Sequence, residues 1–157
     1  MSKKIIITGG LGYIGTELCK LYSGVSWHHE IIVVDNRFIS ERVNQLRNWN
    51  IEFIQGDILD KELVKKYFAD ADIVHHLAGI TDVPRTKSEA SLIQDNKIKD
   101  VGEKGTQNIL EVISVKCKII FPSTHVVYEG LKDVRTDIKE NEPTSPVLSY
   151  SSSILLS

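Results

Sequence analysis

The chain has 157 residues, of which 41% are hydrophobic and 25% are charged, and this composition fits one soluble globular domain. The net charge is −2 and the 19 Lys and Arg residues are scattered, so no nucleic-acid partner is expected. No apolar run has the make-up of a signal peptide or the length of a membrane-spanning helix, so the sequence predicts a cytoplasmic protein with no membrane partner.

Short apolar runs alternate with segments of helical periodicity. In chain order, the pattern predicts a strand at 4–8, a helix at 13–23, strands at 30–35 and 51–56, a helix at 61–69, a strand at 72–79, helices at 87–95 and 97–114, and a strand at 117–123. In the first helix, Ile14, Leu18 and Leu21 are predicted to form the apolar face. The alternation predicts an α/β fold, namely a Rossmann-like doubly wound parallel sheet with helices on both faces.

In such sheets ligands bind beyond the carboxyl ends of the strands, and a glycine-rich segment follows the first strand here. Gly10, Gly12 and Gly15 fit the pattern G-x-G-x-x-G, and Gly9 adds a further glycine. Because glycines have no Cβ atom, a pyrophosphate can come close enough to bind the backbone N–H groups at the start of the helix. The alternative is that these glycines only form a tight turn.

Asp35 ends the second strand, 20 residues after Gly15. A carboxylate at this place accepts hydrogen bonds from the adenosine ribose hydroxyls and repels a 2′-phosphate, so the sequence favours NAD over NADP. Arg37 complicates this interpretation, because a nearby arginine accommodates the extra phosphate. The alternative for Asp35 is a solvated strand end.

Polar and small residues follow the third and fourth strands. Asp57 is predicted either to accept from the adenine amino group, with Ile58 covering the ring, or to cap a turn. The small residues after the fourth strand would let the middle of a dinucleotide lie against the backbone; they are Leu77, Ala78 and Gly79. His75 and His76 have no metal-ligand spacing and are interpreted as structural, and Cys19 and Cys117 as small buried residues.

Seven motifs carry a resemblance to a known family: TGGLGYIG, VVDN, GDI, HLAG, KGTQNILE, PSTHVVYEG and the tyrosine of YSSSI, which together span residues 8–150. In order and spacing they resemble the extended short-chain dehydrogenase/reductase family, the NAD-dependent sugar epimerases and dehydratases. The resemblance implies NAD as the cofactor. Carried over position by position, the cofactor-binding residues are Gly9, Gly12, Tyr13, Ile14, Gly15, Asp35, Asn36, Asp57, Ile58, Leu77, Ala78 and Gly79.

The resemblance also implies a further C-terminal portion that holds a nucleotide-sugar substrate. Residues 1–157 are therefore predicted to be an NAD-binding domain that stops before the last strands and the substrate-binding portion. Family members often pair through helices, so a homodimer is a candidate assembly. The apolar strand at 117–123 is predicted to be an uncovered edge that promotes association.

The catalytic residues implied by the resemblance are Thr124, which would hydrogen-bond the reacting oxygen, and Tyr150, the general base. A free phenol is mostly protonated at neutral pH, and family members place a lysine four residues later, one helical turn away. This chain has Ile154 at that position. It also has Gly102 where the family usually has an asparagine.

Three hypotheses follow. The first is the NAD-binding part of a nucleotide-sugar epimerase or dehydrogenase, inactive as given. A dehydratase is disfavoured because His125 and Val126 stand where the family's dehydratases carry an Asp-Glu pair. The second is a non-catalytic dinucleotide-binding or sensing module, and the third is a remnant of the fold that binds no ligand.

Overall fold

The computed structural model describes residues 1–80, 92–131 and 136–156. One parallel sheet has the strand order β3-β2-β1-β4-β5, with β1 (Lys4–Thr8), β2 (Glu30–Asp35), β3 (Glu52–Gln55), β4 (Ile73–His76) and β5 (Lys118–Ile120). The order reverses between β1 and β4, and Thr8 is level with both Val34 of β2 and His76 of β4. The Rossmann-like doubly wound sheet is therefore confirmed, and its switch point lies at the ends of β1 and β4.

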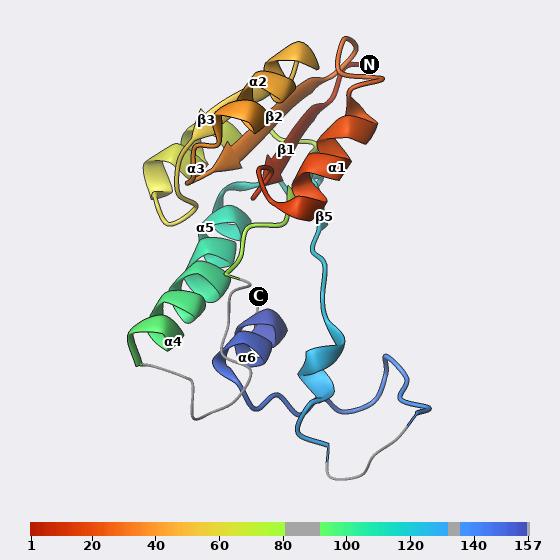
Figure 1. The fold of residues 1–157 in the computed structure, drawn as a ribbon, viewed down its shortest axis with the longest axis vertical. Coiled ribbons are helices and arrows are strands. Elements are labelled where there is room, and N and C mark those ends of the chain that lie inside the picture. The colour runs from red at the N-terminus through yellow and green to blue at the C-terminus, as the bar shows by residue number, and fades with distance from the viewer. Residues whose placement is uncertain (81–91, 132–135, 157) are drawn as a thin grey trace.

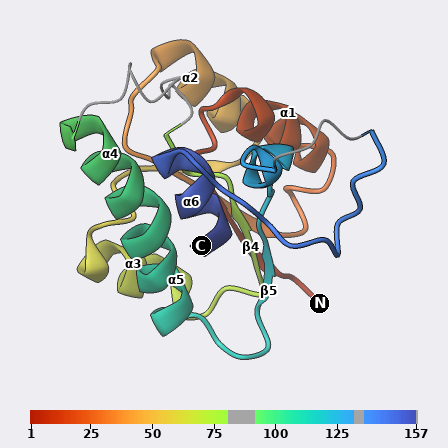
Figure 2. The ribbon, with the colours of Figure 1, turned by 90° about the horizontal axis from the view of Figure 1, so that it is seen from below.

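Each face of the sheet is covered by its own helices. The face that includes Ile5 and Ile7 packs against α1 (Tyr13–Tyr22) and α2 (Ser40–Asn48). Ile6 points the other way, toward α3 (Lys61–Phe68) and α5 (Gly105–Val112), as alternation along a strand requires. Figure 2 shows these two helical layers with the sheet between them.

The apolar face predicted for α1 was wrong at two of its three residues. Ile14 and Leu21 are 61% and 78% exposed, whereas Leu18 is partly buried and packs against the core cluster. The fully buried residues of the helix are Gly15 and Cys19. At Gly15 the helix approaches the loop after β1 too closely for a side chain, so a search for large apolar residues misses this contact.

Helix α2 was missed by the sequence interpretation. It has nine residues, and only Val43 and Leu46 among them are buried. Ile39, just before the helix, packs against the same core cluster. The spacing of these three residues was a helical signal, but polar residues fill the remaining positions.

The predicted helix at 97–114 consists of several segments in the structure. α4 (Leu92–Lys99) continues into the π-helical segment η1 (Asp100–Lys104), which contains Gly102, and then into α5. Figure 1 shows them as one long rod that extends beyond the sheet. Of the helix predicted at 87–95, the part before Leu92 lies outside the described residues.

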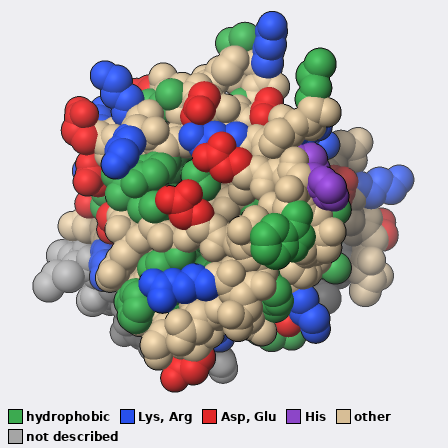
Figure 3. Space-filling view, turned by 90° about the horizontal axis from the view of Figure 1, so that it is seen from above, with side chains coloured by type: hydrophobic (Ala, Val, Ile, Leu, Met, Phe, Trp, Pro, Cys, Tyr) green, Lys and Arg blue, Asp and Glu red, His purple; other side chains and the backbone are tan. Residues whose placement is uncertain are grey.

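Beyond β5 come the 3₁₀ turn η2 (His125–Tyr128) and the helix α6 (Ser149–Leu156), which carries Tyr150. α6 contacts α4, η1 and η2 and lies below the sheet in Figure 1. β5 forms the edge of the sheet, as predicted, and Ile120 on it is 38% exposed. In the described segments no helix combines the length and the apolar character needed to cross a membrane. Figure 3 shows acidic and basic side chains interspersed on the upper face.

Candidate functional site

The glycine-rich loop folds tightly between β1 and α1. Gly9 has φ +65°, and a Cβ atom there would lie 2.8 Å from the Leu77 carbonyl oxygen and 2.9 Å from Ala78. The Gly12 N–H donates to the Gly9 carbonyl at 2.9 Å. Gly12 is the N-cap of α1 and makes no side-chain cap. No side-chain cap therefore occupies the first N–H groups of α1, and pyrophosphate binding at this place stays a prediction.

Asp35 lies at the end of β2 and is only 4% exposed. Its Oδ2 accepts the Leu11 N–H at 3.0 Å, and its Oδ1 accepts the Arg37 N–H at 3.0 Å. The guanidinium of Arg37 adds two further bonds, from Nε to Oδ1 and from Nη2 to Oδ2, both at 3.2 Å. These hydrogen bonds raise the pKa of Arg37. Asp35 is therefore a buried carboxylate beside the glycine-rich loop.

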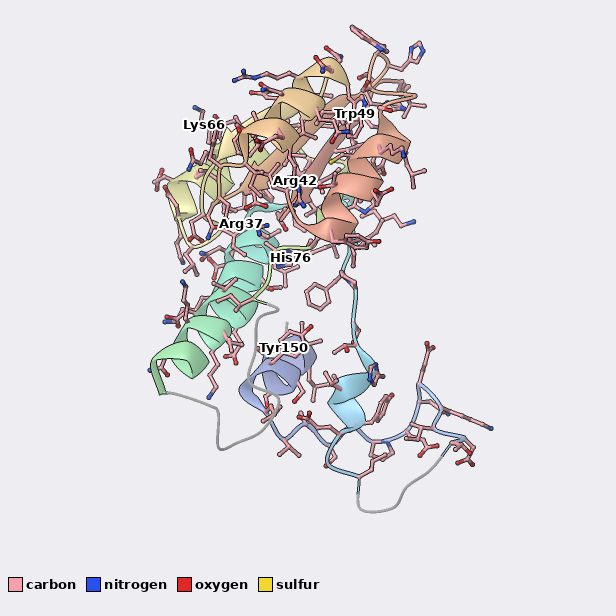
Figure 4. The ribbon with its side chains drawn as sticks, viewed as in Figure 1. Arg37, Arg42, Trp49, Lys66, His76 and Tyr150 are labelled. Atoms are coloured by element: carbon pink, nitrogen blue, oxygen red, sulfur yellow. The ribbon has the colours of Figure 1, made fainter. Side chains whose placement is uncertain are left out.

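A second arginine supports the same loop. Arg42 of α2 donates from Nη1 to the Leu11 carbonyl. Figure 4 shows Arg37 and Arg42 on the part of the molecule where the loop and α2 meet. The contact of Arg42 was not predicted, because α2 itself was missed.

The residues after β3 hold a turn. Asp57 Oδ1 accepts the Leu59 N–H at 3.0 Å, which is the turn-capping role, and Asn36 Nδ2 lies 3.4 Å from its Oδ2. Ile58 is 4% exposed, and its side chain packs so closely on Gly105 that a Cβ there would lie 2.4 Å from it. The adenine contacts assigned to Asp57 and Ile58 stay predictions.

The end of β4 is held by a chain of hydrogen bonds that sequence reasoning missed. Thr8 Oγ1 accepts the N–H groups of Leu77 and Ala78, at 3.1 and 3.0 Å, and lies 2.8 Å from Nδ1 of His76. Nε2 of His76 lies 2.9 Å from Thr106 Oγ1, whose hydroxyl donates to the Gly102 carbonyl. One chain of side chains therefore connects β1, β4 and η1.

The direction of each bond in this chain follows from counting hydrogens. Thr8 Oγ1 accepts two N–H groups, of which that of Leu77 is shared with the Thr8 carbonyl oxygen at 3.2 Å, and this favours donation of the hydroxyl hydrogen to Nδ1 of His76. His76 therefore carries its hydrogen on Nε2 and is neutral. Burial lowers the pKa of His76 to about 4, which agrees with this assignment. The sequence does contain a signal for this hydrogen bond, because the polar residues Thr8 and His76 end the two strands that meet at the switch point.

The neighbouring His75 is also held structurally. Its Nε2 lies 2.7 Å from the hydroxyl of Tyr22, and the two rings meet edge to face. Burial lowers the pKa of His75. Among the described residues, no group of three His, Cys, Asp or Glu side chains is placed to hold a metal ion.

A small pocket of about 20 Å³ lies between α6, η1 and the end of β4, with room for about one water molecule. Tyr150 and Ile154 both line it, so the two positions share one face of α6, as the spacing predicted. The other lining residues come mainly from the strand ends and from the α4–η1–α5 rod; they are Ala78, Gly79, Ile80, Ile98, Gly102, Thr106, Phe121 and Ser153. Figure 4 shows Tyr150 below His76 and the sheet.

Two further residues position the region of Tyr150. Thr124 is the N-cap of η2, where its Oγ1 accepts the Val126 N–H at 3.4 Å, and η2 contacts α6. Glu129 holds the start of α6, since its Oε1 accepts the N–H groups of Val147 and Leu148 at 2.8 and 2.7 Å. Thr124 does not line the small pocket with Tyr150, so its catalytic role stays a prediction.

Comparison with known proteins gives the same family along nearly the whole chain. The model of the NAD dependent epimerase/dehydratase family matches residues 5–156. The UDP-glucose 4-epimerase of Neisseria meningitidis serogroup C is 32% identical over 92% of this chain and 44% of its own length. The UDP-N-acetyl-alpha-D-glucosaminuronate decarboxylase of Bacillus cytotoxicus is 35% identical over 82% of this chain and 38% of its own length.

Solved structures share this fold over nearly the whole chain. The UDP-Glc/GlcNAc 4-epimerase of Campylobacter jejuni superposes with a TM-score of 0.79 at 25% identity, over 99% of this chain and 46% of that one. The Bordetella bronchiseptica enzyme WbmG, in complex with NAD, shares the fold with a TM-score of 0.77 at 22% identity, over 99% of this chain and 48% of that one. The chain thus spans somewhat less than half the length of these relatives. The glycine-rich loop, the buried strand-end carboxylate and the matched family model together show that the chain belongs to the NAD-dependent epimerase/dehydratase family.

Proposed function

We propose that the chain binds NAD as the dinucleotide-binding part of a nucleotide-sugar epimerase or dehydrogenase. The observation that carries this proposal is the placement of Asp35 beside an uncapped helix start and a loop in which Gly9 and Gly15 leave no room for a Cβ atom. A pyrophosphate suits the N–H groups of α1, and a ribose suits a carboxylate at the end of β2. The family uses NAD, which accepts and returns a hydride when bound.

The residues present fit this cofactor in three ways. Gly9 and Gly15 leave space against backbone that any side chain would fill. The start of α1 offers N–H groups and the positive end of the helix dipole to a phosphate. The backbone of Leu77 and Ala78 lies directly beside Gly9. These residues would hold the cofactor, together with Gly12, Tyr13, Ile14, Asp35, Asn36 and Gly79.

The binding proposal is tested by calorimetric titration with NAD and NADH. We expect saturable binding by the wild-type chain and a loss of at least tenfold in affinity for Asp35→Ala, because the carboxylate would no longer accept from the ribose. Asp70→Ala is a matched control, since Asp70 is an exposed carboxylate that pairs with Lys4. An absence of binding at millimolar cofactor would contradict the proposal.

In the chemistry that we propose for the whole protein, Tyr150 takes the proton of a sugar hydroxyl and Thr124 holds the reacting oxygen. The substrate would be a nucleotide-linked sugar. In this chain the position one turn after Tyr150 holds Ile154, which brings no charge to the pocket. Without a lysine at position 154, we infer that the chain turns over little or no substrate.

The second candidate function is a non-catalytic dinucleotide-binding or sensing module. It is favoured by the apolar pocket beside Tyr150, where Ile154 and Gly102 occupy the positions of the family's lysine and asparagine. Both candidates predict NAD binding and they differ in turnover. Oxidation of UDP-glucose with formation of NADH would exclude the non-catalytic module.

We further propose that the nicotinamide ribose of the cofactor lies beside Tyr150, and replacing Ile154 with lysine tests this placement. Because Ile154 shares the pocket with Tyr150, an ammonium there would reach the nicotinamide ribose, and we expect about tenfold tighter NAD binding from one charge-assisted hydrogen bond. Ile154→Met is the control, since methionine is a long unbranched side chain like lysine but carries no charge. Equal NAD affinities of the two variants, measured by calorimetry, would argue against this placement.

A further inference from the structure

The carboxylate of Asp35 has no acceptor site left for a ribose. A carboxylate offers about four lone-pair sites, and four N–H groups occupy them in this structure. Two of these come from the backbone of Leu11 and Arg37, and two come from the guanidinium of Arg37. Ribose hydroxyls can bind Asp35 only where the guanidinium withdraws.

The same guanidinium lies near the start of α1. Nη2 of Arg37 is 3.9 Å from the position that a Cβ of Gly12 would take. Gly12 is the N-cap of α1, where the pyrophosphate is proposed to bind. Arg37 therefore occupies the acceptor sites of the carboxylate and is a close neighbour of the proposed pyrophosphate site.

Arg37 is free to move away. Its side chain is 56% exposed, whereas that of Asp35 is 3% exposed. The exposed guanidinium regains water when it withdraws, which offsets part of the bond energy that it loses, although its bidentate geometry makes the pair stronger than an ordinary surface ion pair. The backbone bonds of Leu11 and Arg37 would keep Asp35 in place after the side chain leaves.

We propose that Arg37 is a displaceable cap on the ribose site that weakens NAD binding and admits a 2′-phosphate. This inference rests on the proposed NAD binding. NAD must displace the guanidinium from Asp35, and the cost of this displacement lowers the affinity of the chain for NAD. NADP brings its own anion, and a guanidinium is a bidentate partner for phosphate oxygens. A freed Arg37 then neutralises the 2′-phosphate that Asp35 alone would repel.

The experiment compares NAD and NADP binding by calorimetry for wild type, Arg37→Ala and Arg47→Ala. Arg47 lies exposed in the last turn of α2, so its removal changes the net charge equally without touching Asp35. We expect Arg37→Ala to bind NAD about fivefold more tightly, which corresponds to one weak ion pair. We also expect its preference for NAD over NADP to rise about tenfold or more, whereas Arg47→Ala stays within about twofold of wild type for both.

The outcomes separate the two proposals. Weaker or unchanged NAD binding by Arg37→Ala, with normal binding by wild type, would overturn the cap and leave the proposed function standing. If Arg37→Ala bound NAD more tightly but kept the wild-type preference for NAD over NADP, the proposed contact of Arg37 with the 2′-phosphate would be overturned. If no variant bound NAD, the proposed function and the Arg37 cap would be overturned together. If only Arg37→Ala bound NAD, the proposed function and the cap would both be supported. Thermal unfolding without ligand, equal for the three proteins, excludes a folding defect as the cause.

Discussion

Replacing Gly15 with alanine is expected to destabilise the fold by about 2 kcal/mol and to abolish NAD binding. A Cβ atom at this position would lie 2.6 Å from both the Gly10 Cα and the Gly9 carbonyl oxygen. Both neighbours are backbone, so the helix or the loop must shift. Alanine in a helix interior gains about 1 kcal/mol over glycine from propensity, and the clash is expected to exceed this gain.

Gly24→Ala is the matched control for this substitution. A Cβ at Gly24 would meet its nearest atom, the Leu21 carbonyl oxygen, only at 4.0 Å. The free energy of unfolding in urea should change by less than about 0.5 kcal/mol for Gly24→Ala, and its NAD affinity should match wild type. If Gly15→Ala proved as stable as Gly24→Ala and bound NAD normally, the close approach of α1 to the loop would be incorrect.

Lowering the pH from 6.5 to 4 is expected to remove about 3 kcal/mol of stability through His76 alone. Burial lowers the pKa of His76 from 6.5 to about 4 in the folded chain. The unfolded chain therefore takes up a proton on this residue below pH 6.5, while the folded chain does not until about pH 4. Protons thus favour the unfolded state in this interval, and the stabilisation is complete only above pH 6.5.

Urea unfolding at pH 7 and at pH 4.5 measures this effect against His76→Gln. The variant lacks the titrating ring, so its stability should fall less over the interval. It should also be about 1–3 kcal/mol less stable at pH 7, because the hydroxyls of Thr8 and Thr106 lose a well-placed partner. His75, whose pKa burial also lowers, adds a decline of the same sign that both proteins share.

The exposed His28→Gln serves as the control for this pH experiment. It removes one imidazole without touching the chain of Thr8, His76 and Thr106, so its pH dependence should match wild type. Parallel declines for His76→Gln and wild type would contradict the buried, neutral state of His76.

The sheet was predictable because its strands are short apolar runs. Residues such as Ile6 and Val33 are completely buried between two helical layers, and no surface face interrupts their runs with polar residues. The helices were harder to place, since a helix buries only a stripe. α2 buries just Val43 and Leu46 among polar residues, and α1 buries Gly15 and Cys19 while it exposes larger apolar side chains.

The candidate site was predictable where the backbone imposes a residue type. Gly9 needs a positive φ and close backbone contact, and Gly15 needs the same closeness, so glycines mark them in the sequence. Side-chain pairings were not predictable in this way. The guanidinium of Arg37 was noted only as a neighbour of Asp35, and the sequence could not reveal that it fills the acceptor sites of that carboxylate.

The hydroxyl of Thr8 has a consequence for how a ligand meets the end of β4. It already accepts the N–H groups of Leu77 and Ala78, so these two residues have no backbone N–H left to offer a ligand. On this side of the switch point a ligand would have to bring its own hydrogen-bond donors, as sugar hydroxyls do. At the start of α1 the backbone N–H groups would act as the donors, which suits a phosphate. The two sides of the switch point thus suit the two kinds of polar group that a dinucleotide carries, its hydroxyls and its phosphates.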